Sequence, residues 1–353
     1  MRRIDYYMLK VRQMFINLVL LAFVLVIMLS LFEGGLRVIS SHERDMISTP
    51  NGYVYKPNST IVYETEHFSN TYEINSEGFV DYDHELTSEK YRIALLGDSF
   101  IEATQVPFDL ALPRLMESVD VEVMSFGLSA IGTSQELIIF NEYTSKYRPD
   151  AVVLFFFAGN DLINNHYDLQ DDVYRPYYVL EDGELQLVRY EPTLRDRAIK
   201  LAKKSYAIRF FNTKFQILLG TKNTQGGAVA KYYVYDDEWP KAYVESWEVT
   251  QKVILQLQQD VEKDGAEFLL VVVNGPEHVD STIREEVEGL IGTPLNWTLP
   301  NDKMQVFCET NEIHCIDLKD HFVQASLHIE GNGHWSEEGH RLVSEVVLDA
   351  LRY

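Results

Sequence analysis

The sequence predicts an α/β fold of three layers, in which a five-stranded parallel sheet lies between two layers of helices. One transmembrane helix is expected before this domain. Two observations support the prediction. Short apolar runs typical of buried strands alternate with longer segments of helical periodicity, which is the pattern of parallel sheets. A single long apolar run stands near the N-terminus, ahead of every expected strand.

The N-terminal run from Met14 to Phe32 is almost continuously apolar. At about 1.5 Å per residue, its roughly 19 residues can cross a hydrocarbon layer about 30 Å thick. Four basic residues and one acidic residue precede the run, and this bias places the N-terminus in the cytoplasm. We expect a cytoplasmic basic tail over 1–13 and an uncleaved single-pass anchor of the cell inner membrane over 14–33. A cleaved signal sequence is the alternative, but no Ala-x-Ala-like site follows the run.

The rest of the chain is expected in the periplasm or outside the cell. Residues 34–90 are rich in Ser, Asn, Tyr and Glu, so we expect an irregular wrap there. Strands and helices alternate from residue 91 onward, and 91–353 is interpreted as one α/β domain. Its expected strands are 91–96, 121–126, 151–157, 267–273 and a short one at 313–316.

Helices are expected between these strands and after the last of them. From their periodicity and end signals, they lie near 109–119, from Thr133 or Ser134 onward, over about 239–264 and after residue 335. Residues 165–238 break the alternation and are read as an insertion. This segment is rich in tyrosines and has a basic patch from Arg195 to Lys204. Its tyrosines either cover the site and stack on sugar rings, or form a small satellite core.

The net charge of the chain is −23. Such an acidic balance argues against a nucleic-acid partner and against docking on anionic lipid headgroups. Its simplest interpretation is solubility.

The two cysteines, Cys308 and Cys315, are close in the sequence. In an oxidising compartment they can form a disulfide, and two free buried thiols are the alternative. A zinc site needs further ligands at suitable spacing. The sequence does not offer them, so we expect no metal and no other cofactor.

The sequence Gly97-Asp98-Ser99 directly follows the strand at 91–96. A strand that stops there places the serine hydroxyl at the carboxyl end of a sheet, where open α/β folds hold their reactive groups. His334 lies in a loop just before the last helix, and Asn160 follows the strand at 151–157. We therefore expect all three side chains at one edge of the sheet, with the imidazole as base for a serine nucleophile.

These blocks occur in a fixed order along the chain. The order is Asn75-Ser-Glu-Gly78-Phe79 after the anchor, Gly97-Asp98-Ser99, a Gly-rich turn at 127–132, Asn160-Asp161 and His334-Trp335. The set resembles the SGNH (GDSL-type) hydrolase superfamily, and more closely its bacterial membrane-anchored branch related to alginate-type O-acetyltransferases. The resemblance runs from about Ile74 to the C-terminus and implies a flavodoxin-like SGNH fold.

By this resemblance, Ser99 is the nucleophile and His334 is the base. The oxyanion hole would consist of the Ser99 amide, a backbone amide at Ala130 and the side chain of Asn160. The chain departs from the family pattern in two respects. The first concerns the oxyanion block, where Ala130 stands in place of the family's glycine and Ser125 replaces the asparagine that ends the second strand.

The second departure concerns the acid of the triad. The family has an aspartate two or three residues before the histidine, and these positions here hold Asn332 and Gly331. Asparagine can orient an imidazole but cannot stabilise imidazolium with a charge, and the equivalent change in serine proteases lowers turnover by about 10⁴-fold. Glu330 is the alternative orienting group.

Three functions follow from these observations. The first is a membrane-anchored serine esterase or O-acyltransferase that acts through a Ser-His acyl-enzyme on O-acetylated surface or exported polysaccharide. The second is a hydrolase of other small acyl esters or lipids. The third is a catalytically weak carbohydrate-binding or scaffold subunit of a polysaccharide export machine. The expected partners are an acyl ester, the lipid bilayer through the N-terminal helix and polysaccharide-export proteins.

Overall fold

The computed structural model describes residues 2–39, 46–49, 52–65, 68–170, 175–189, 231–351 and scattered positions between 193 and 214. The chain divides into two compact units. One consists of Met1–Glu43 with Pro192–Thr224, and the other of Arg44–Glu191 with Gln225–Tyr353. The second unit holds the sheet and every candidate site residue.

Helix α1 (Arg2–Ile39) belongs to the first unit. Its segment Arg12–Arg37 is long and apolar enough to cross a membrane, and its side chains are not buried inside the protein. By length and composition, such a helix near the N-terminus is either a membrane span or a signal sequence.

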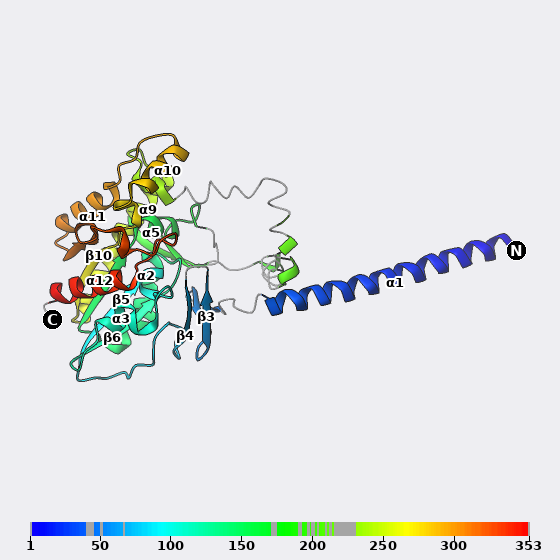
Figure 1. The fold of residues 1–353 in the computed structure, drawn as a ribbon, viewed down its shortest axis with the longest axis horizontal. Helices are drawn as coiled ribbons and strands as arrows, with labels where there is room; N and C mark the ends of the chain where they lie inside the picture. Colours follow the sequence, from blue (N-terminus) through cyan, green and yellow to red (C-terminus); the bar gives the residue numbers. More distant parts are fainter. Residues whose placement is uncertain are drawn as a thin grey trace. The chain divides into compact units, whose positions relative to one another are not determined.

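The second unit is built on five parallel strands in the order β6-β5-β7-β10-β11. Strands β5, β6 and β10 are labelled in Figure 1. They are β5 (Tyr91–Gly97), β6 (Val121–Gly127), β7 (Ala151–Phe156), β10 (Glu267–Val272) and β11 (Cys315–Asp317). Counted along the chain, this order is 2-1-3-4-5, which is the flavodoxin-like order. The predicted fold class is therefore confirmed, and β5 and β7 flank the point at which the strand order reverses.

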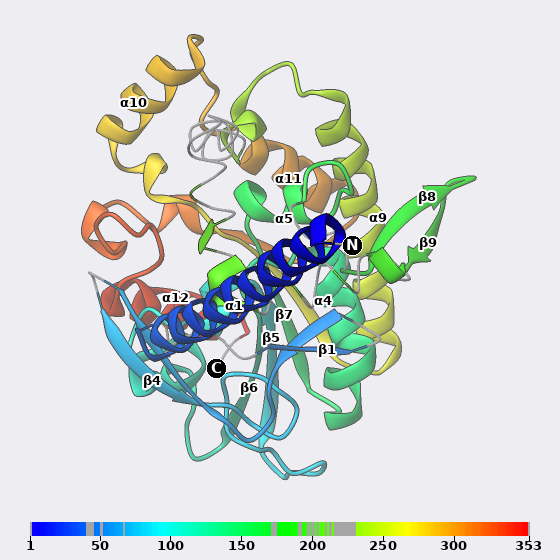
Figure 2. The same ribbon diagram turned by 90° about the vertical axis from the view of Figure 1, so that its right-hand side faces the viewer.

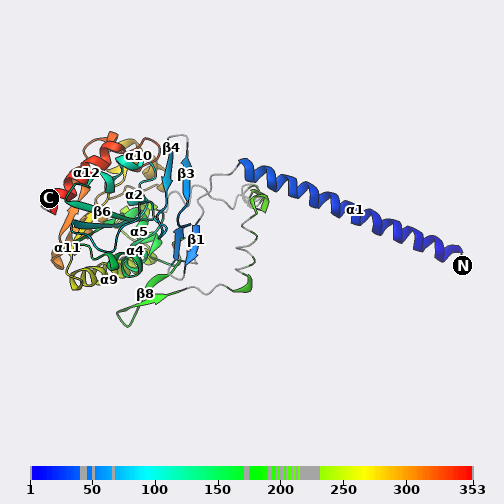
Figure 3. The ribbon, with the colours of Figure 1, turned by 90° about the horizontal axis from the view of Figure 1, so that it is seen from below.

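Alternation along the strands divides the core into two halves. On one face of the sheet, Ala94, Leu96 and their equivalents pack in the cluster that contains α4 (Thr133–Ile139), α9 (Lys241–Lys263) and α11 (Leu299–Thr310). On the other face, Ile93 and Leu95 pack with α12 (Glu337–Ala350) and the fully buried Trp335. Figure 3 shows α9 and α12 on opposite sides of the sheet.

The expectation of an irregular wrap over 34–90 is partly wrong, because the described part of it contains two β-hairpins. The first pairs β1 (Met46–Thr49) with β2 (Gly52–Tyr55), and the second pairs β3 (Thr60–Glu64) with β4 (Ser69–Glu73). Two tyrosines anchor them to the sheet domain. Tyr55 and Tyr72 are buried, and Tyr72 donates its hydroxyl to the carbonyl of Thr104 at 2.6 Å.

The Asn75-Ser-Glu-Gly78-Phe79 motif forms a tight turn after β4. The side-chain oxygen of Asn75 accepts the amides of Glu77 and Phe79 at 3.1 and 2.9 Å. Gly78 has φ of +96°, and a Cβ there would lie 2.6 Å from the carbonyl oxygen of Tyr55, so only glycine fits. Phe79 is fully buried against Phe126 of β6. The motif therefore fastens the N-terminal segment to the sheet.

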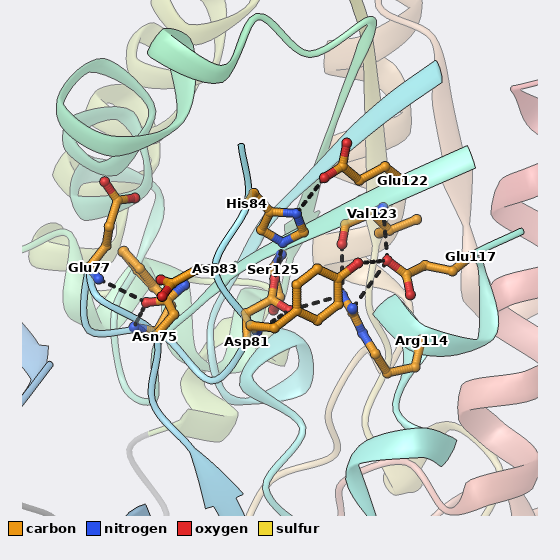
Figure 4. A network of polar contacts seen from close by, with 12 residues as sticks. Asn75, Glu77, Asp81, Asp83, His84, Arg114, Glu117, Glu122, Val123 and Ser125 are labelled. Carbon is orange, nitrogen blue, oxygen red and sulfur yellow. Dashed lines mark hydrogen bonds and ion pairs between the residues drawn. The ribbon is translucent and has the colours of Figure 1, made fainter. Parts of the chain in front are cut away.

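The residues after this turn cover the open edge of β6 (Figure 4). Asp81 accepts the backbone amide of Ser125 at 2.7 Å, and Arg114 donates to the carbonyl of Val123 at 2.7 Å. Arg114 and Asp81 also form an ion pair at 3.0 Å. These contacts satisfy backbone groups that an edge strand otherwise leaves free to pair with another chain. His84 extends the network by contacting both Asp81 and Glu122.

The described part of the insertion contains one hairpin and one buried tyrosine. The hairpin consists of β8 (Tyr177–Glu181) and β9 (Glu184–Val188), and Figure 2 shows it projecting beside α9. Tyr235 is buried, contacts the ring of Trp297 and donates its hydroxyl to Glu277 at 2.6 Å. Tyr235 thus belongs to the main core on the α9 face of the sheet, which neither of the two alternatives above describes. Tyr174 and Tyr190 lie outside the described residues.

Two helix predictions need correction. The helix expected near 109–119 is only one turn, α3 (Leu112–Leu115), because Ser118 accepts the amides of Asp120 and Val121 and turns the chain into β6. Helix α4 does begin at Thr133, but its N-cap residue is Gly132. A distant side chain replaces the expected local cap, since Asn165 Oδ1 accepts the amide of Ser134 at 2.9 Å.

Two helices after β10 were not predicted, α10 (Ser281–Ile291) and α11. Helix α11 contains Cys308 and ends at Thr310, and β11 begins at Cys315. Both cysteines are free thiols in this structure, which corresponds to the second alternative above. The hydrogen bond with Cys308 and burial raise the pKa of Cys315.

Candidate active site

Ser99 lies at the carboxyl end of β5, the strand between β6 and β7. Asp98 is the N-cap of the short helix α2 (Ser99–Glu102), and its side chain accepts the amide of Phe100 at 3.0 Å. Ser99 is therefore the first helical residue, and it is half-buried. This is the sheet edge and the strand position that the sequence predicts.

The structure brings His334 to Ser99 although the two are 235 residues apart. The Nε2 atom of His334 lies 2.8 Å from Ser99 Oγ, and its Nδ1 atom lies 2.6 Å from Asn332 Oδ1. His334 comes from the loop before α12, and its ring packs 5.0 Å from the ring of Phe100. The three side chains thus form one line of hydrogen bonds.

The orientation of the Asn332 amide decides which tautomer of His334 is favoured. The backbone N–H of His334 also points at Asn332 Oδ1, at 3.4 Å. A backbone N–H can only donate, so the oxygen rather than the NH₂ group of Asn332 faces the histidine. The imidazole then carries its proton on Nδ1, and Nε2 is left to accept the proton of Ser99.

Glu330, the alternative orienting group, is exposed to solvent. The oxygen next to His334 Nδ1 belongs to Asn332. Asn332 follows Gly331 at φ +71° and precedes Gly333 at φ +86°. Two residues in the left-handed region curl the loop so that the side chain at 332 reaches back to the ring.

Asn160 lies in α5 (Ala158–Asn164), the helix that follows β7. Its Nδ2 atom donates to Asp98 Oδ2 at 2.7 Å, and its Oδ1 atom accepts from Asn164 Nδ2 at 2.8 Å. Asn164 is itself oriented by the carbonyl of Ile131, to which it donates at 3.1 Å. This chain of amides fixes the NH₂ group of Asn160 beside the serine turn, with one N–H still available for an oxyanion.

Ala130 is in the loop between β6 and α4 and is exposed. Its φ of +59° lies in the left-handed region, where a Cβ is strained by about 1–2 kcal/mol. The glycine expected from the family pattern would adopt this conformation freely. The chain therefore keeps the turn geometry at 130 in spite of the substitution.

One buried residue near the site was missed in the sequence. Glu102 ends α2, is almost fully buried and accepts hydrogen bonds from the hydroxyls of Tyr55 and Ser129. Ser129 precedes Ala130, so Glu102 joins the serine helix to the oxyanion loop and to the N-terminal hairpin. Gly127 permits this contact, since a Cβ there would overlap the backbone nitrogen of Glu102. The position three residues after Ser99 was the only signal in the sequence.

Three buried carboxylic acids surround the Asn160 side of the site. Burial raises the pKa of Asp98 to about 6, while its hydrogen bonds from Phe100 and Asn160 oppose the shift. Burial and the neighbouring charges of Asp161 and Asp98 raise the pKa of Glu136 well above its ordinary value. Burial also raises the pKa of Asp161. The Oδ2 atom of Asp161 accepts the amide of Phe157 at 2.5 Å.

Among the described residues, no cluster of three or more His, Cys, Asp or Glu side chains could hold a metal ion.

The second histidine of the C-terminal motif has a structural role. His340 is buried, and its Nδ1 atom accepts the amide of Leu112 at 3.2 Å. Burial, together with the charge of His334, lowers its pKa to about 3. His340 is therefore neutral at physiological pH and supports the start of α3.

No family model and no curated protein matches the chain. Solved structures with similar folds include an acetyl xylan esterase, 13% identical, with a TM-score of 0.40 over 74% of this chain and 99% of that chain. A lipase/acylhydrolase from Enterococcus faecalis is 15% identical, with a TM-score of 0.36 over 74% and 95%. A lipolytic protein of the G-D-S-L family from Veillonella parvula DSM 2008 is 12% identical, with a TM-score of 0.37 over 73% and 96%. Similarities this low describe the fold alone.

The chain has the flavodoxin-like strand order 2-1-3-4-5, with Ser99 directly after β5. What the chain does with this fold depends on the geometry of its own site.

Proposed function

We propose that this chain is a membrane-anchored serine esterase or O-acyltransferase of SGNH type, which acts on O-acetylated surface or exported polysaccharide. The observation that carries the proposal is the line of hydrogen bonds from Asn332 through His334 to Ser99, at 2.6 and 2.8 Å. A nucleophile, a base and an orienting group in contact are what acyl transfer through a serine requires.

In the first half of the reaction, Ser99 Oγ attacks the acyl carbonyl while His334 Nε2 takes the hydroxyl proton. The tetrahedral oxyanion is stabilised by the amides of Ser99 and Ala130 and by Asn160 Nδ2. Collapse breaks the ester bond, and the imidazolium returns the proton to the leaving sugar hydroxyl. The product of this half is an acyl ester on Ser99.

In the second half, His334 removes a proton from water or from another sugar hydroxyl, which attacks the acyl-enzyme. Water gives hydrolysis, and a sugar hydroxyl gives transfer. The two activities share every residue named and differ only in the acceptor. Binding of the polysaccharide next to the membrane agrees with an anchor at the N-terminus, and polysaccharide-export proteins are the expected partners.

A second candidate function is a binding or scaffold subunit of low catalytic activity. It is favoured by Asn332, which has no charge to stabilise an imidazolium, and by the strained Ala130. The geometry around His334 gives the correct tautomer, so we rank this candidate second.

The test is covalent labelling of the full-length protein in detergent with a fluorophosphonate probe, followed by peptide mass analysis. We expect a single adduct on Ser99, and none in Ser99→Ala or His334→Ala. Release of acetate from acetylated polysaccharide, with and without an added sugar acceptor, then separates hydrolysis from transfer. A wild-type protein that is neither labelled nor active on acetyl esters would establish the scaffold candidate instead.

A further inference from the structure

The end of helix α1 forms a specific contact with the insertion. Glu33 accepts hydrogen bonds from the hydroxyl of Ser205 at 2.8 Å and from the amides of Tyr206 and Ala207 at 3.2 and 2.8 Å. Arg37 donates to the same carboxylate at 2.9 Å. All of these residues belong to the first compact unit. Residues more than 170 positions apart in the chain are therefore joined at the end of the apolar run.

Aromatic rings lie directly beside this contact. The ring of Phe32, the last residue of the apolar run, lies 5.6 Å from the ring of Phe210 and 5.6 Å from that of Phe211. Phe210 and Phe211 remain 40% and 54% exposed, and Ile208 is 49% exposed. Large apolar side chains that gather at the surface mark a contact with a partner or a membrane.

The charge of residues 195–214 is opposite in sign to that of the rest of the chain. Between residues 195 and 214 the sequence has seven Lys or Arg and one Asp, whereas the whole chain has a net charge of −23. Two cations lie over the aromatic rings, Arg37 over Tyr206 at 5.3 Å and Lys214 over Phe210 at 5.8 Å. Apolar rings with basic neighbours are typical of segments that lie in a membrane interface.

We propose that residues 205–208, 210 and 211 lie in the membrane interface beside the outer end of α1, with Ile208, Phe210 and Phe211 among the lipids and Arg37 and Lys214 near anionic headgroups. The inference rests on the proposed function in one respect, that α1 crosses the bilayer. If the run from Met14 to Phe32 spans a hydrocarbon layer of about 30 Å, Phe32 lies at the outer surface of that layer. The rings that contact Phe32 must then lie at the same depth.

Two consequences distinguish this contact from a general affinity for lipid. Glu33 holds residues 205–207 to α1, so we expect the mature protein to retain the helix rather than lose it as a leader. The insertion would thereby be a second part of the chain that contacts the bilayer. Its basic side chains favour anionic lipid, which the net charge of −23 of the whole chain disfavours.

The test uses the full-length protein in vesicles of phosphatidylcholine and phosphatidylglycerol, with the phosphatidylcholine brominated near the headgroup end of its acyl chains. Phe211→Trp adds a fluorophore to the segment, and the parent protein supplies the background of the native tryptophans. Val323→Trp is the matched control, because Val323 is 73% exposed in the other unit. We expect the brominated lipid to quench the added emission of Phe211→Trp more strongly than that of Val323→Trp. Equal quenching would overturn the proposal.

Three further measurements test its parts. Glu33→Ala in the Phe211→Trp background should reduce quenching, because the segment is no longer held to α1, and unchanged quenching would refute the role of Glu33. Omission of phosphatidylglycerol should also reduce quenching, and an equal value would refute the electrostatic contribution. Intact mass shows whether α1 is retained, and a protein that lacks it would contradict the inference. Ester hydrolysis measured on the same samples reports on the proposed function independently.

Discussion

Asn164 donates its side-chain amide to Asn160 at 2.8 Å, and this bond determines which end of the Asn160 amide faces the serine turn. The orientation of Asn164 follows in turn from the carbonyl of Ile131, which can only accept. Asn164, which lies outside the proposed oxyanion hole, thus positions Asn160, the side-chain donor proposed for it.

Asn164→Ala should therefore lower kcat by about 10-fold with little change in KM, since the oxyanion exists only after substrate has bound. Asn160→Ala removes the donor itself and should cost about 10²- to 10³-fold. Steady-state kinetics on p-nitrophenyl acetate measures both. Asn141→Ala, at an exposed position, is the control. A rise in KM at constant kcat for Asn164→Ala would show that this residue acts on binding rather than on the oxyanion.

Asn332→Asp should raise turnover. The asparagine already imposes the correct tautomer on His334, so the aspartate adds mainly a negative charge next to the developing imidazolium. We expect an increase of about 10- to 100-fold in kcat/KM for acetyl esters. Glu330→Ala is the matched control and should leave turnover within about twofold, because Glu330 is exposed. A loss of activity in Glu330→Ala would instead identify Glu330 as the orienting group.

Substitutions at Ala130 should separate backbone strain from oxyanion binding. Ala130→Gly keeps the amide and relieves the left-handed conformation at φ +59°, so kcat should be unchanged or higher. Ala130→Val adds branching at Cβ and should lower the free energy of unfolding by about 1–2 kcal/mol. Urea unfolding of the purified protein together with kinetics provides both values. An unaltered stability of Ala130→Val would mean that residue 130 does not have positive φ in solution.

Ser129→Ala breaks the bond between the oxyanion loop and Glu102. The loop then keeps its sequence but loses one of the contacts that hold it against α2, and we expect a decrease of about 10-fold in kcat at nearly constant KM. Tyr55→Phe removes the other hydroxyl from Glu102 and should have a similar but smaller effect. Ser281→Ala, at an exposed helix start, is the control. Wild-type kcat in both variants would exclude Glu102 as a positioning residue.

His84 should make the stability of the protein depend on pH. Burial lowers the pKa of His84, but hydrogen bonds and charges from Asp81 and Glu122 outweigh burial and raise it above the usual value. Such a histidine stabilises the fold fully below its unfolded pKa of about 6.5 and loses this contribution as the pH rises through the folded pKa. The difference in unfolding free energy between wild type and His84→Gln should thus be largest at about pH 6 and decrease towards alkaline pH. Urea titrations over a pH series measure it, and a constant difference would refute the ion pair.

The sheet and the main site residues could be predicted because their signals are local. Each buried strand is an unbroken apolar run, and Ser99 and Asn160 directly follow two of them. His334 could be placed because a loop and a helix follow the last strand.

The remaining features depend on contacts between distant residues, which no local pattern records. Asn165 caps α4 from another helix, and Tyr55 reaches Glu102 across 47 residues of chain. The hairpins at 46–73 were missed for the same reason. Their strands are held by a few buried tyrosines rather than by a regular alternation of apolar and polar residues.

The distance in sequence between Ser99 and His334 also has a consequence for biosynthesis. Ser99, α2 and Asn160 are all synthesised before the loop that carries His334, which α12 follows. Because chains fold from the N-terminal side during synthesis, a chain that stops before residue 334 has Ser99 without its histidine. Under the proposed function, such a chain should be inert toward esters.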